Sequence, residues 1–406
     1  MFRSVAIALT LCLATITAQA ASFTPLQNPS GGSNLQLGVG ISADGSTVVG
    51  SGYTAAGPEA VRWVNGGSPQ GIGFMAGGDQ SYGVATSADG SVIVGRGSAL
   101  QGVGDPYPGN ALIQGFRWTQ ASGMQSLGYL PNGGYYAVAN GVSADGSVVT
   151  GYSDGSLNEM AYRWTQSDGL QPIGTLPYGG SHWSRANAVS GDGLVIVGES
   201  SGTVGVSSGS QAFRWTASSG ISALMPLAGA TSTTALGVSA DGAVIVGQSY
   251  IPSCSGCVPP VLSRNNAVRW TNEGAATLLG QVPGGDQGSV ARAASADGSV
   301  IVGMYQVNAN DPLTGLRAFV WTAGDGMQKL FDVLLMQGAT GLSGWTLLQA
   351  TAVSADGRTI AGKGLNPAGA AQAFVATLNP VPIPPAVLLF SSAIGVMGWM
   401  RRKSVS

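Results

Sequence analysis

The residues of this 406-residue chain that could carry acid–base chemistry are 19 acids and one histidine. Seven of the aspartates recur in the tetrapeptide Ser-Ala-Asp-Gly or in its single variant, Ser-Gly-Asp-Gly. An aspartate in a tight turn usually accepts hydrogen bonds from its own backbone, so these seven are interpreted as structural. Among the other twelve, Asp79 and Asp286 both follow Gly-Gly and precede Gln. A glycosidase would need two such carboxylates roughly 5–10 Å apart, a distance that spacing alone does not define.

The single histidine, His182, stands beside Trp183 in the segment GGSHWS, residues 179–184. It could act as a general base or contact a sugar, or it could be an exposed loop residue. A Ser-His-Asp triad would have to use this histidine, but the chain has no Gly-x-Ser-x-Gly elbow. We therefore predict no catalytic residue, no metal ligand and no cofactor site.

Cys254 and Cys257 form a lone Cys-x2-Cys pair in a proline-flanked segment. In an oxidising compartment this spacing favours a small loop disulfide. A zinc site would need two further ligands, which a chain with one histidine hardly supplies. A thioredoxin-type redox site expects a strand-to-helix setting, which the flanking prolines disfavour.

The composition favours short strands and turns. Gly numbers 65 and Pro 20, only 9% of residues are charged, and 44% are hydrophobic. The chain is too apolar for disorder, and its glycines lack the three-residue period of collagen. Four of the 17 basic residues lie in the two end segments, so the chain between them is mildly acidic. Nucleic-acid binding, which requires a basic surface, is therefore not expected.

The first 20 residues resemble a secretory signal peptide. Arg3 precedes an apolar run, and Ala18-Gln19-Ala20 provides small residues for cleavage by signal peptidase. The alternative is a membrane anchor, but the apolar stretch is shorter than the roughly 20 residues that a span requires. Residues 1–20 therefore predict export.

The last segment, 380–406, has a Pro-rich break, an apolar run of 15 residues (Ala386–Met400) and the basic end Arg-Arg-Lys. This three-part tail resembles the PEP-CTERM sorting signal, in its Val-Pro-x-Pro variant. The resemblance implies transient insertion in the inner membrane, processing by an exosortase-type enzyme, and a final location in the periplasm, at the cell surface or outside the cell. The alternative is a permanent C-terminal anchor, thin but possible if flanking side chains snorkel.

Between these ends, one motif recurs seven times. Each copy continues into an apolar run that ends in Gly, and six copies later carry a Trp, five of them as Arg-Trp. The turns are separated by 45 to 59 residues and begin at Ser42, Ser87, Ser143, Ser190, Ser239, Ser295 and Ser354. Periodicity favours a structural role for the arginines, by stacking or bonding within the repeat.

Each repeat parses into four short strands. Asp-Gly between two β-prone segments is a strong hairpin signal, because Gly accepts a positive φ. A variable loop, the Trp strand and a second glycine-containing turn follow. Four strands per repeat predict an all-β, seven-bladed β-propeller over residues 21–379, with a β-solenoid as the alternative. The last repeat lacks a fourth strand, so residues 23–27 are predicted to complete that blade and close the ring.

The strand before each turn has Gly or Ala both four and two positions ahead of the Ser. A spacing of two places them on one strand face, which a neighbouring sheet could approach closely, with the Trp filling the remaining space. The position between them varies. If this strand is the innermost, its variable side chains would line the axis. They are Val39, Val84, Asn140, Asn187, Leu236, Arg292 and Thr351.

The pattern S-A-D-G-x-V-[VI]-V-G, followed by A-F-R-W-T and G-M-x-x-L-G, resembles bacterial extracellular repeats of the HAF type. The resemblance covers nearly the whole segment from Ser22 to about Leu378, and it implies architecture rather than activity.

These observations lead to two hypotheses of function. The first is an exported, non-catalytic envelope or matrix protein that binds polysaccharide or protein through loops on one propeller face, notably 96–114 and 249–266. The second is an extracellular glycan-active enzyme, a hydrolase or lyase, with its site in the funnel. The residues expected to contact a ligand are Tyr107, Tyr135, Tyr136, Tyr178, His182 and Trp183.

Overall fold

The computed structural model describes residues 20–29, 40–99, 112–155, 158–177, 182–204, 207–252, 264–271, 274–284, 287–307, 311 and 314–379. The ring described below belongs to one compact unit, Ala21–Leu378. Several predictions lie outside the described residues. They are those for residues 1–19, for the tail 380–406, for the pair Cys254 and Cys257, and for Tyr107 and Tyr178.

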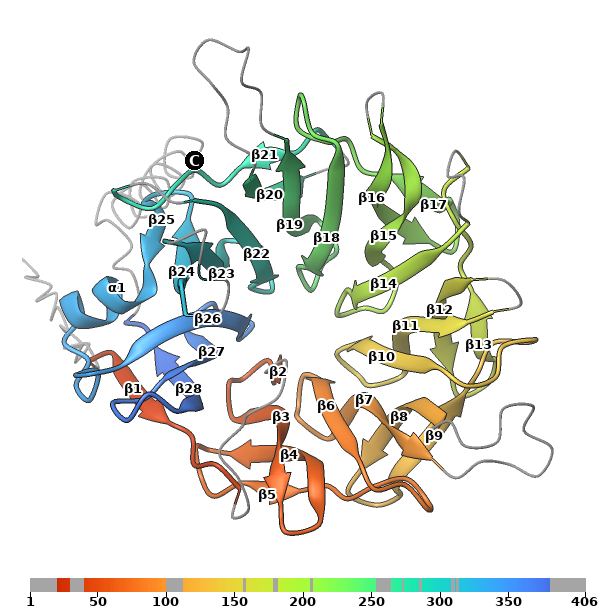
Figure 1. Ribbon diagram of the computed structural model, residues 1–406, viewed down its shortest axis with the longest axis horizontal. Coiled ribbons are helices and arrows are strands. Elements are labelled where there is room, and N and C mark those ends of the chain that lie inside the picture. The colour runs from red at the N-terminus through yellow and green to blue at the C-terminus, as the bar shows by residue number, and fades with distance from the viewer. Residues whose placement is uncertain are drawn as a thin grey trace, which may run out of the picture. The chain divides into compact units, whose positions relative to one another are not determined.

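Seven four-stranded antiparallel sheets form a ring, which confirms the predicted seven-bladed β-propeller (Figure 1). Blade 1 comprises β2 (Gly40–Ile41), β3 (Thr47–Thr54), β4 (Gly57–Val64) and β5 (Gln70–Gly71). Blade 2 comprises β6 (Ser81–Thr86), β7 (Val92–Ala99), β8 (Leu112–Thr119) and β9 (Gly123–Gly128). Blade 3 comprises β10 (Ala137–Val142), β11 (Val148–Asp154), β12 (Glu159–Thr165) and β13 (Gly169–Pro172). Blade 4 comprises β14 (Ser184–Val189), β15 (Ile196–Val204), β16 (Ser207–Thr216) and β17 (Gly220–Ala223).

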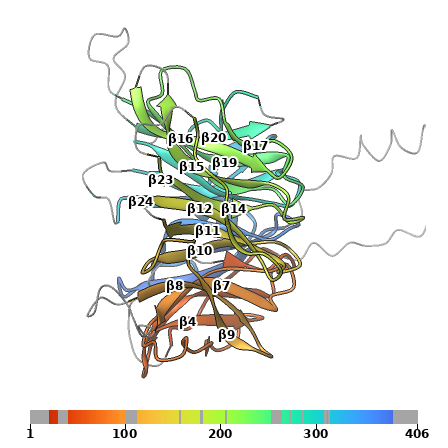
Figure 2. The same cartoon turned by 90° about the vertical axis from the view of Figure 1, so that its right-hand side faces the viewer.

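The remaining blades repeat this plan. Blade 5 comprises β18 (Ser232–Val238), β19 (Val244–Ile251), β20 (Arg264–Thr271) and β21 (Thr277–Leu278). Blade 6 comprises β22 (Ser289–Ala294), β23 (Val300–Gln306), β24 (Leu316–Thr322) and β25 (Gly326–Lys329). Blade 7 comprises β26 (Thr346–Val353), β27 (Thr359–Leu365), β28 (Ala371–Thr377) and β1 (Ser22–Pro25). Figure 2 shows the strands of successive blades from the side.

The strand that precedes each Ser-x-Asp-Gly turn is the innermost of its blade, next to the centre of the ring (Figure 1). Because neighbouring strands are antiparallel, these turns emerge on one face of the ring, which we name the turn face. The loops between second and third strands, and the links from one blade to the next, emerge on the opposite face, which we name the linker face. The variable loops predicted to contact a partner therefore begin and end on the linker face.

The N-terminal strand closes the ring, as predicted. β1 pairs with β28 in antiparallel register, from Ser22 opposite Thr377 to Pro25 opposite Phe374. The Phe23 ring is buried and contacts Trp345 (centroids 5.1 Å apart) and Phe374 (5.6 Å). The outer edge of the last blade is thereby covered by the start of the chain.

The repeated turns confirm the structural interpretation of their aspartates. In blade 2 the Ser87 hydroxyl donates to Asp89 Oδ1 (2.7 Å), which also accepts from the Ser91 amide (3.0 Å). The Val92 amide donates in turn to Ser87 Oγ (3.0 Å), and Gly90 has a φ of +72°. The same serine-to-aspartate bond occurs in all seven turns.

A cyclic chain of backbone hydrogen bonds joins the seven turns. In every turn, the residue after the Ser donates its amide to the carbonyl of the equivalent residue in the next blade, at 2.8–3.0 Å. The order of donors around the ring is Ala43, Ala88, Ala144, Gly191, Ala240, Ala296 and Ala355, the last donating to Ala43. Seven donors and seven acceptors are satisfied in one closed circuit.

A β-bulge interrupts the inner strand at its variable position in blades 2 to 7. In blade 2 the register shifts between Gly83 and Ala85, and the inner strands of blades 3 to 7 shift at the same place. The prediction that the two small residues share one face is therefore incomplete, because a bulge redirects the side chains around it. A Cβ on Gly83 would lie 2.7 Å from Val49 Cγ1 in the preceding blade, whereas one on Gly40 would lie 2.8 Å from the Val84 carbonyl oxygen in the next blade.

The repeated Trp fills space between blades, as expected. Trp63 is fully buried with Leu26, Ala361 and Ala373 of the preceding blade and its link. The arginine before it bonds within its own blade, as predicted, and also reaches the next blade. Arg62 Nε donates to Gln70 Oε1 of blade 1 (3.0 Å), and its Nη2 donates to Gln120 Oε1 of blade 2 (2.7 Å). Arg62 stacks over Trp118 at 4.9 Å, and Arg269 over Trp321 at 4.6 Å.

One element was not predicted. The helix α1 (Leu330–Met336) lies in the link between blades 6 and 7 and buries Leu330 and Leu334, four residues apart and so on one helix face. Among the described residues, no helix combines the length and apolarity needed to cross a membrane.

Candidate functional site

A central channel of about 630 Å³ runs between the inner strands. Its lining includes the bulge residues, so the expectation that these variable side chains face the axis is confirmed for blades 2 to 7, while Val39 of blade 1 lies outside the described residues. The bulge residues in the lining are Val84, Asn140, Asn187, Leu236, Arg292 and Thr351. Gln349 and Lys363 of blade 7 complete its polar and charged groups, together with Thr86.

Two of the polar bulge residues brace the ring. Asn140 Nδ2 donates to the Ala186 carbonyl (2.9 Å), and Asn187 Nδ2 donates to the Ala235 carbonyl (2.8 Å). Each bond runs from one inner strand to the inner strand of the next blade, so these amides have a structural task as well as a place in the channel.

Arg292 and Lys363 are the charged residues of this lining, and none of its 21 described residues is Asp or Glu. Burial lowers the pKa of the Arg292 guanidinium. Burial also lowers the pKa of the Lys363 amine, and the nearby positive charge of Arg292 lowers it further. The channel therefore presents two cations that the surrounding lining does not neutralise.

A second concentration of polar and aromatic groups lies on the linker face, at the boundary between blades 3 and 4. Arg185, at the start of β14, stacks over Tyr152 at 5.2 Å and over Trp183 at 5.4 Å. The Tyr152 ring lies 6.1 Å from that of Tyr136. We name the group formed by Tyr136, Tyr152, Trp183 and Arg185 the aromatic–arginine cluster.

Two carboxylates hold Arg185 in place. Its Nε and Nη2 both lie 2.5 Å from Glu159 Oε2, and its Nη1 lies 4.0 Å from Glu199 Oε1. Glu199 also accepts hydrogen bonds from Ser210 (2.6 Å) and Thr234 (3.0 Å). Burial lowers the pKa of Arg185, but its hydrogen bond and charge contact with Glu159 outweigh burial, so the pKa is raised.

The predicted contact residues are partly brought together. Tyr136 and Trp183 belong to the cluster, and the neighbouring Tyr135 is 45% exposed and donates its amide to Asp154 Oδ2 (3.2 Å). His182 is exposed beside Trp183, with a φ of +39°. The sequence reasoning missed Tyr152 and Arg185.

The feature of the sequence that could have revealed Tyr152 and Arg185 is that two paired positions of the repeat, one on the first strand and one on the second, vary from blade to blade. Arg185 pairs with Glu199, and Gln349 pairs with Lys363, at the same distance from the turn of their blades. At the second of these positions the other blades carry Ser51, Arg96, Tyr152, Gln248 and Met304. Variable positions in an otherwise regular repeat are those least needed for packing.

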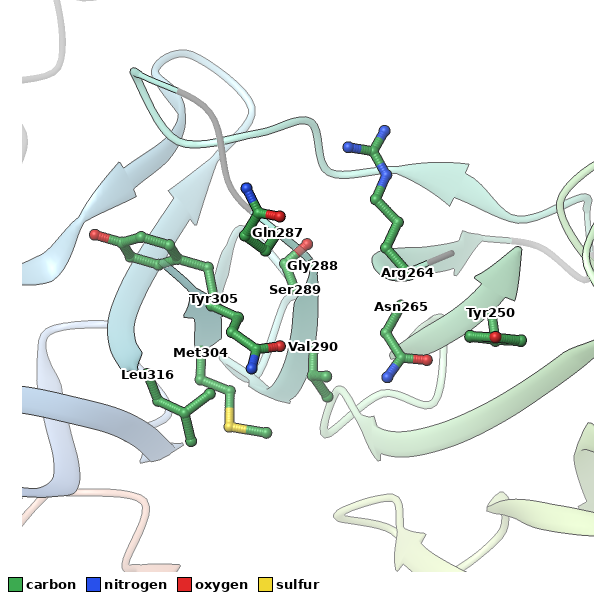
Figure 3. A pocket seen from close by; sticks show the side chains of 11 residues that line it. Tyr250, Arg264, Asn265, Gln287, Gly288, Ser289, Val290, Met304, Tyr305 and Leu316 are labelled. Atoms are coloured by element: carbon green, nitrogen blue, oxygen red, sulfur yellow. The ribbon is translucent and has the colours of Figure 1, made fainter. Parts of the chain in front are cut away.

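A smaller pocket of about 260 Å³ lies at the linker-face side of blades 5 and 6 (Figure 3). Tyr250, Arg264 and Asn265 line it from blade 5, and Met304 and Tyr305 line it from blade 6. The blade 5 residues lie within 249–266, one of the two loops expected to contact a partner, whereas no contact was predicted for the blade 6 residues.

The remaining acids that bear on catalysis have local partners. Asp79 accepts from the Ser98 hydroxyl (2.9 Å), and its counterpart Asp286 lies outside the described residues. Glu59 accepts from the Thr54 hydroxyl (2.8 Å) and the Gly73 amide (2.8 Å). Within the described part of the chain, no group of three or more His, Cys, Asp or Glu side chains could hold a metal ion.

No family model matches this sequence, and no curated protein matches it significantly. Among solved structures, an oligogalacturonate lyase from Vibrio parahaemolyticus has a TM-score of 0.54 at 11% identity, with 89% of this chain and 97% of that chain covered. A TolB from Acinetobacter baumannii has a TM-score of 0.38 at 15% identity, over 59% of this chain and 52% of that one, so the match spans about half of that TolB. A gluconolactonase from Xanthomonas campestris has a TM-score of 0.37 at 11% identity, over 90% and 92% of the two chains. The similarity to the lyase, at this identity, is one of propeller fold.

Proposed function

We propose that this protein is an exported, non-catalytic propeller of the cell envelope or extracellular matrix that binds polysaccharide on its linker face. The observation that carries the proposal is the aromatic–arginine cluster, in which Trp183, Tyr152 and Tyr136 gather around Arg185 on the face where the variable loops begin and end. A protein partner is the other ligand class considered.

The cluster has the properties that sugar recognition needs. Aromatic rings offer apolar faces of fixed orientation on which the C–H face of a sugar can stack. The side chains of Arg185, Glu159 and Glu199 are 41%, 31% and 18% exposed, so their donors and acceptors are partly open to hydroxyl groups. Because Arg185 is held between two carboxylates, little side-chain entropy remains to be lost on binding.

Export is proposed from the two ends of the sequence. The segment 1–20 has the layout of a signal peptide, and 380–406 resembles a PEP-CTERM tail. The expected processing partners are signal peptidase and an exosortase-type enzyme. Fractionation of cells that produce the tagged chain tests this part, and recovery of an unprocessed chain from the cytosol would contradict it.

The binding proposal is tested with the purified full chain on an array of neutral and acidic bacterial polysaccharides. We expect binding that Trp183→Ala weakens by at least tenfold. Tyr53→Ala is the matched control, because it removes an aromatic side chain from the linker-face end of β3 in blade 1, outside the loops expected to contact a partner. Absence of binding to every polysaccharide, or equal binding by the Trp183 variant, would count against the proposal.

A glycan-active hydrolase or lyase is the second candidate. One observation favours it, since Glu159 and Glu199 approach the same guanidinium and thus form a pair of carboxylates in one cluster. Incubating a bound polysaccharide with the full chain and measuring new chain ends distinguishes the two. Cleavage that disappears in Glu159→Gln or Glu199→Gln would replace the binding function with catalysis.

A further inference from the structure

Arg292 differs from its counterparts in the neighbouring blades. It occupies the bulge of β22, at the position where Asn140 and Asn187 each donate to a carbonyl of the next blade. Its Nε atom is buried and has no hydrogen-bond partner among the described residues. A buried donor without a partner costs about 1–3 kcal/mol, and a charged one costs more. The other described blades carry uncharged residues at this position, so packing alone does not require a buried arginine here.

Lys363 adds a second cation to the same lining. It lies on β27 opposite Gln349, and both residues line the channel. Arg292 on β22 and Lys363 on β27 line this channel from neighbouring blades, and the charge of Arg292 contributes to lowering the pKa of Lys363. A channel with two cations and no acid among its described lining residues has a positive potential, which a low-dielectric wall strengthens.

We propose that the central channel contains an oxyanion site formed by Arg292 and Lys363, which binds a carboxylate of an acidic polysaccharide. The planar guanidinium presents paired N–H donors that match the two oxygens of a carboxylate, and a lysine ammonium adds a point charge. The channel volume of about 630 Å³ lies in the range of small-molecule pockets, so it admits a sugar as well as its charged group. The inference rests on the proposed function for the identity of the ligand as polysaccharide.

The repeats supply substitutions that the fold already accommodates. Leu236 and Asn187 stand at the equivalent bulge in blades 5 and 4, so Arg292→Leu and Arg292→Asn place native side chains of this motif at the site. In Arg292→Asn the new amide is expected to donate to the Ala350 carbonyl, as Asn187 does to that of Ala235. Both variants should therefore keep or raise the free energy of unfolding while losing the anion site.

Calorimetric titration of the full chain with four probes tests the site. They are a uronic-acid trisaccharide, a neutral trisaccharide of the same linkage, a sulfated trisaccharide and inorganic phosphate. We expect the uronate to bind more tightly than the neutral sugar. Arg292→Asn and Lys363→Met should each weaken uronate binding by about tenfold or more, the loss expected for one charge-assisted hydrogen bond. Arg358→Gln, which removes an exposed arginine outside the channel lining, is the charge-matched control and should bind like the parent chain.

Three results of these titrations would each count against the proposed channel site or its assignment to a carboxylate. Uronate binding that is unchanged in Arg292→Asn, or no preference for uronate over the neutral sugar, would overturn the site. Phosphate or the sulfated sugar bound as tightly as the uronate would overturn the assignment to a carboxylate. Trp183→Ala separates this inference from the proposed function: if that variant abolishes binding and the Arg292 variants do not, the linker-face function stands and the channel site fails.

Discussion

The amide of Ala355 in blade 7 donates to the carbonyl of Ala43 in blade 1 at 2.8 Å, which closes the circuit of seven hydrogen bonds on the turn face. The ring is closed a second time at the outer edge of blade 7, where the N-terminal strand β1 pairs with β28. One closure uses only backbone near the axis, and the other uses a strand from the opposite end of the chain. The ring therefore does not depend on the N-terminal strand alone.

Ala144→Pro tests the inner circuit. Proline suits the second position of a tight turn but lacks the N–H that Ala144 donates to the Gly191 carbonyl. We expect the free energy of unfolding to fall by about 1–3 kcal/mol, the cost of leaving that carbonyl without its donor. Ala144→Gly keeps the donor, as Gly191 does in blade 4, and should cost less in urea-induced unfolding. Equal losses in the two variants would show that the circuit contributes nothing.

Phe23→Ala tests the outer closure. The ring of Phe23 is buried against Trp345 and Phe374, so its removal leaves a cavity between β1 and the last blade. The expected loss in the free energy of unfolding is about 3–5 kcal/mol. Thr24→Ala changes an exposed neighbour on the same strand and should stay within about 0.5 kcal/mol of the parent. A Phe23 variant as stable as the Thr24 variant would be inconsistent with this packing.

The turn aspartates predict a loss of stability in acid. The Ser91 amide, followed by the hydroxyls of Ser87 and Ser91, lowers the pKa of Asp89 from 3.8 to about 2. The stabilisation is complete above pH 3.8 and is lost as the pH falls through about 2, because the unfolded chain takes up the proton first. Asp89→Asn should thus differ from the parent in unfolding free energy at pH 5 and converge with it near pH 2. A gap that does not change with pH would refute this.

Lys363 predicts that stability also rises with pH at the alkaline end, because its charged form is the one that burial disfavours. Its pKa is lowered below 10.5 by burial and then by the charge of Arg292, so the folded chain releases this proton before the unfolded chain does. Where the unfolded state holds more protons, stability rises with pH. Lys363→Met, which places the residue of blade 6 at this position, should gain stability relative to the parent at neutral pH, and the gain should shrink as the pH approaches 10.5. A constant or growing difference measured by urea unfolding between pH 7 and 10.5 would exclude the buried charge.

Local chemistry explains why the fold could be predicted. The Asp89 turn is specified by four adjacent residues, and the same chemistry recurs in every blade, so the count of seven blades followed from the repeat. Which strand of a blade lies innermost did not follow from it. The end of the last repeat after its third strand, at Leu378, and the strand-like start at Phe23 likewise predicted how the ring closes.

The departures from prediction come from contacts between blades. The bulge at Arg292 was missed because an extra residue in one strand is defined by its partner strand rather than by its own sequence. Arg62 bonds within its own blade, as predicted, but its stacking over Trp118 of the next blade was not foreseen, because that ring comes from another repeat. Helix α1 was missed because it lies in a link between blades, outside the part of the sequence that repeats.

By itself, then, the sequence determined the four-stranded repeat, the number of blades and the closing of the ring by the N-terminal strand. The reason is that turns and strand alternation are encoded within a few residues. Only the tertiary structure decided which variable side chains meet, because neighbours around a ring come from different repeats. Arg292 of blade 6 and Lys363 of blade 7 line the same channel, and Tyr152 of blade 3 stacks against Arg185 of blade 4. Distance along the chain carries no information about such pairs, whereas closure of the sheets into a ring sets them side by side.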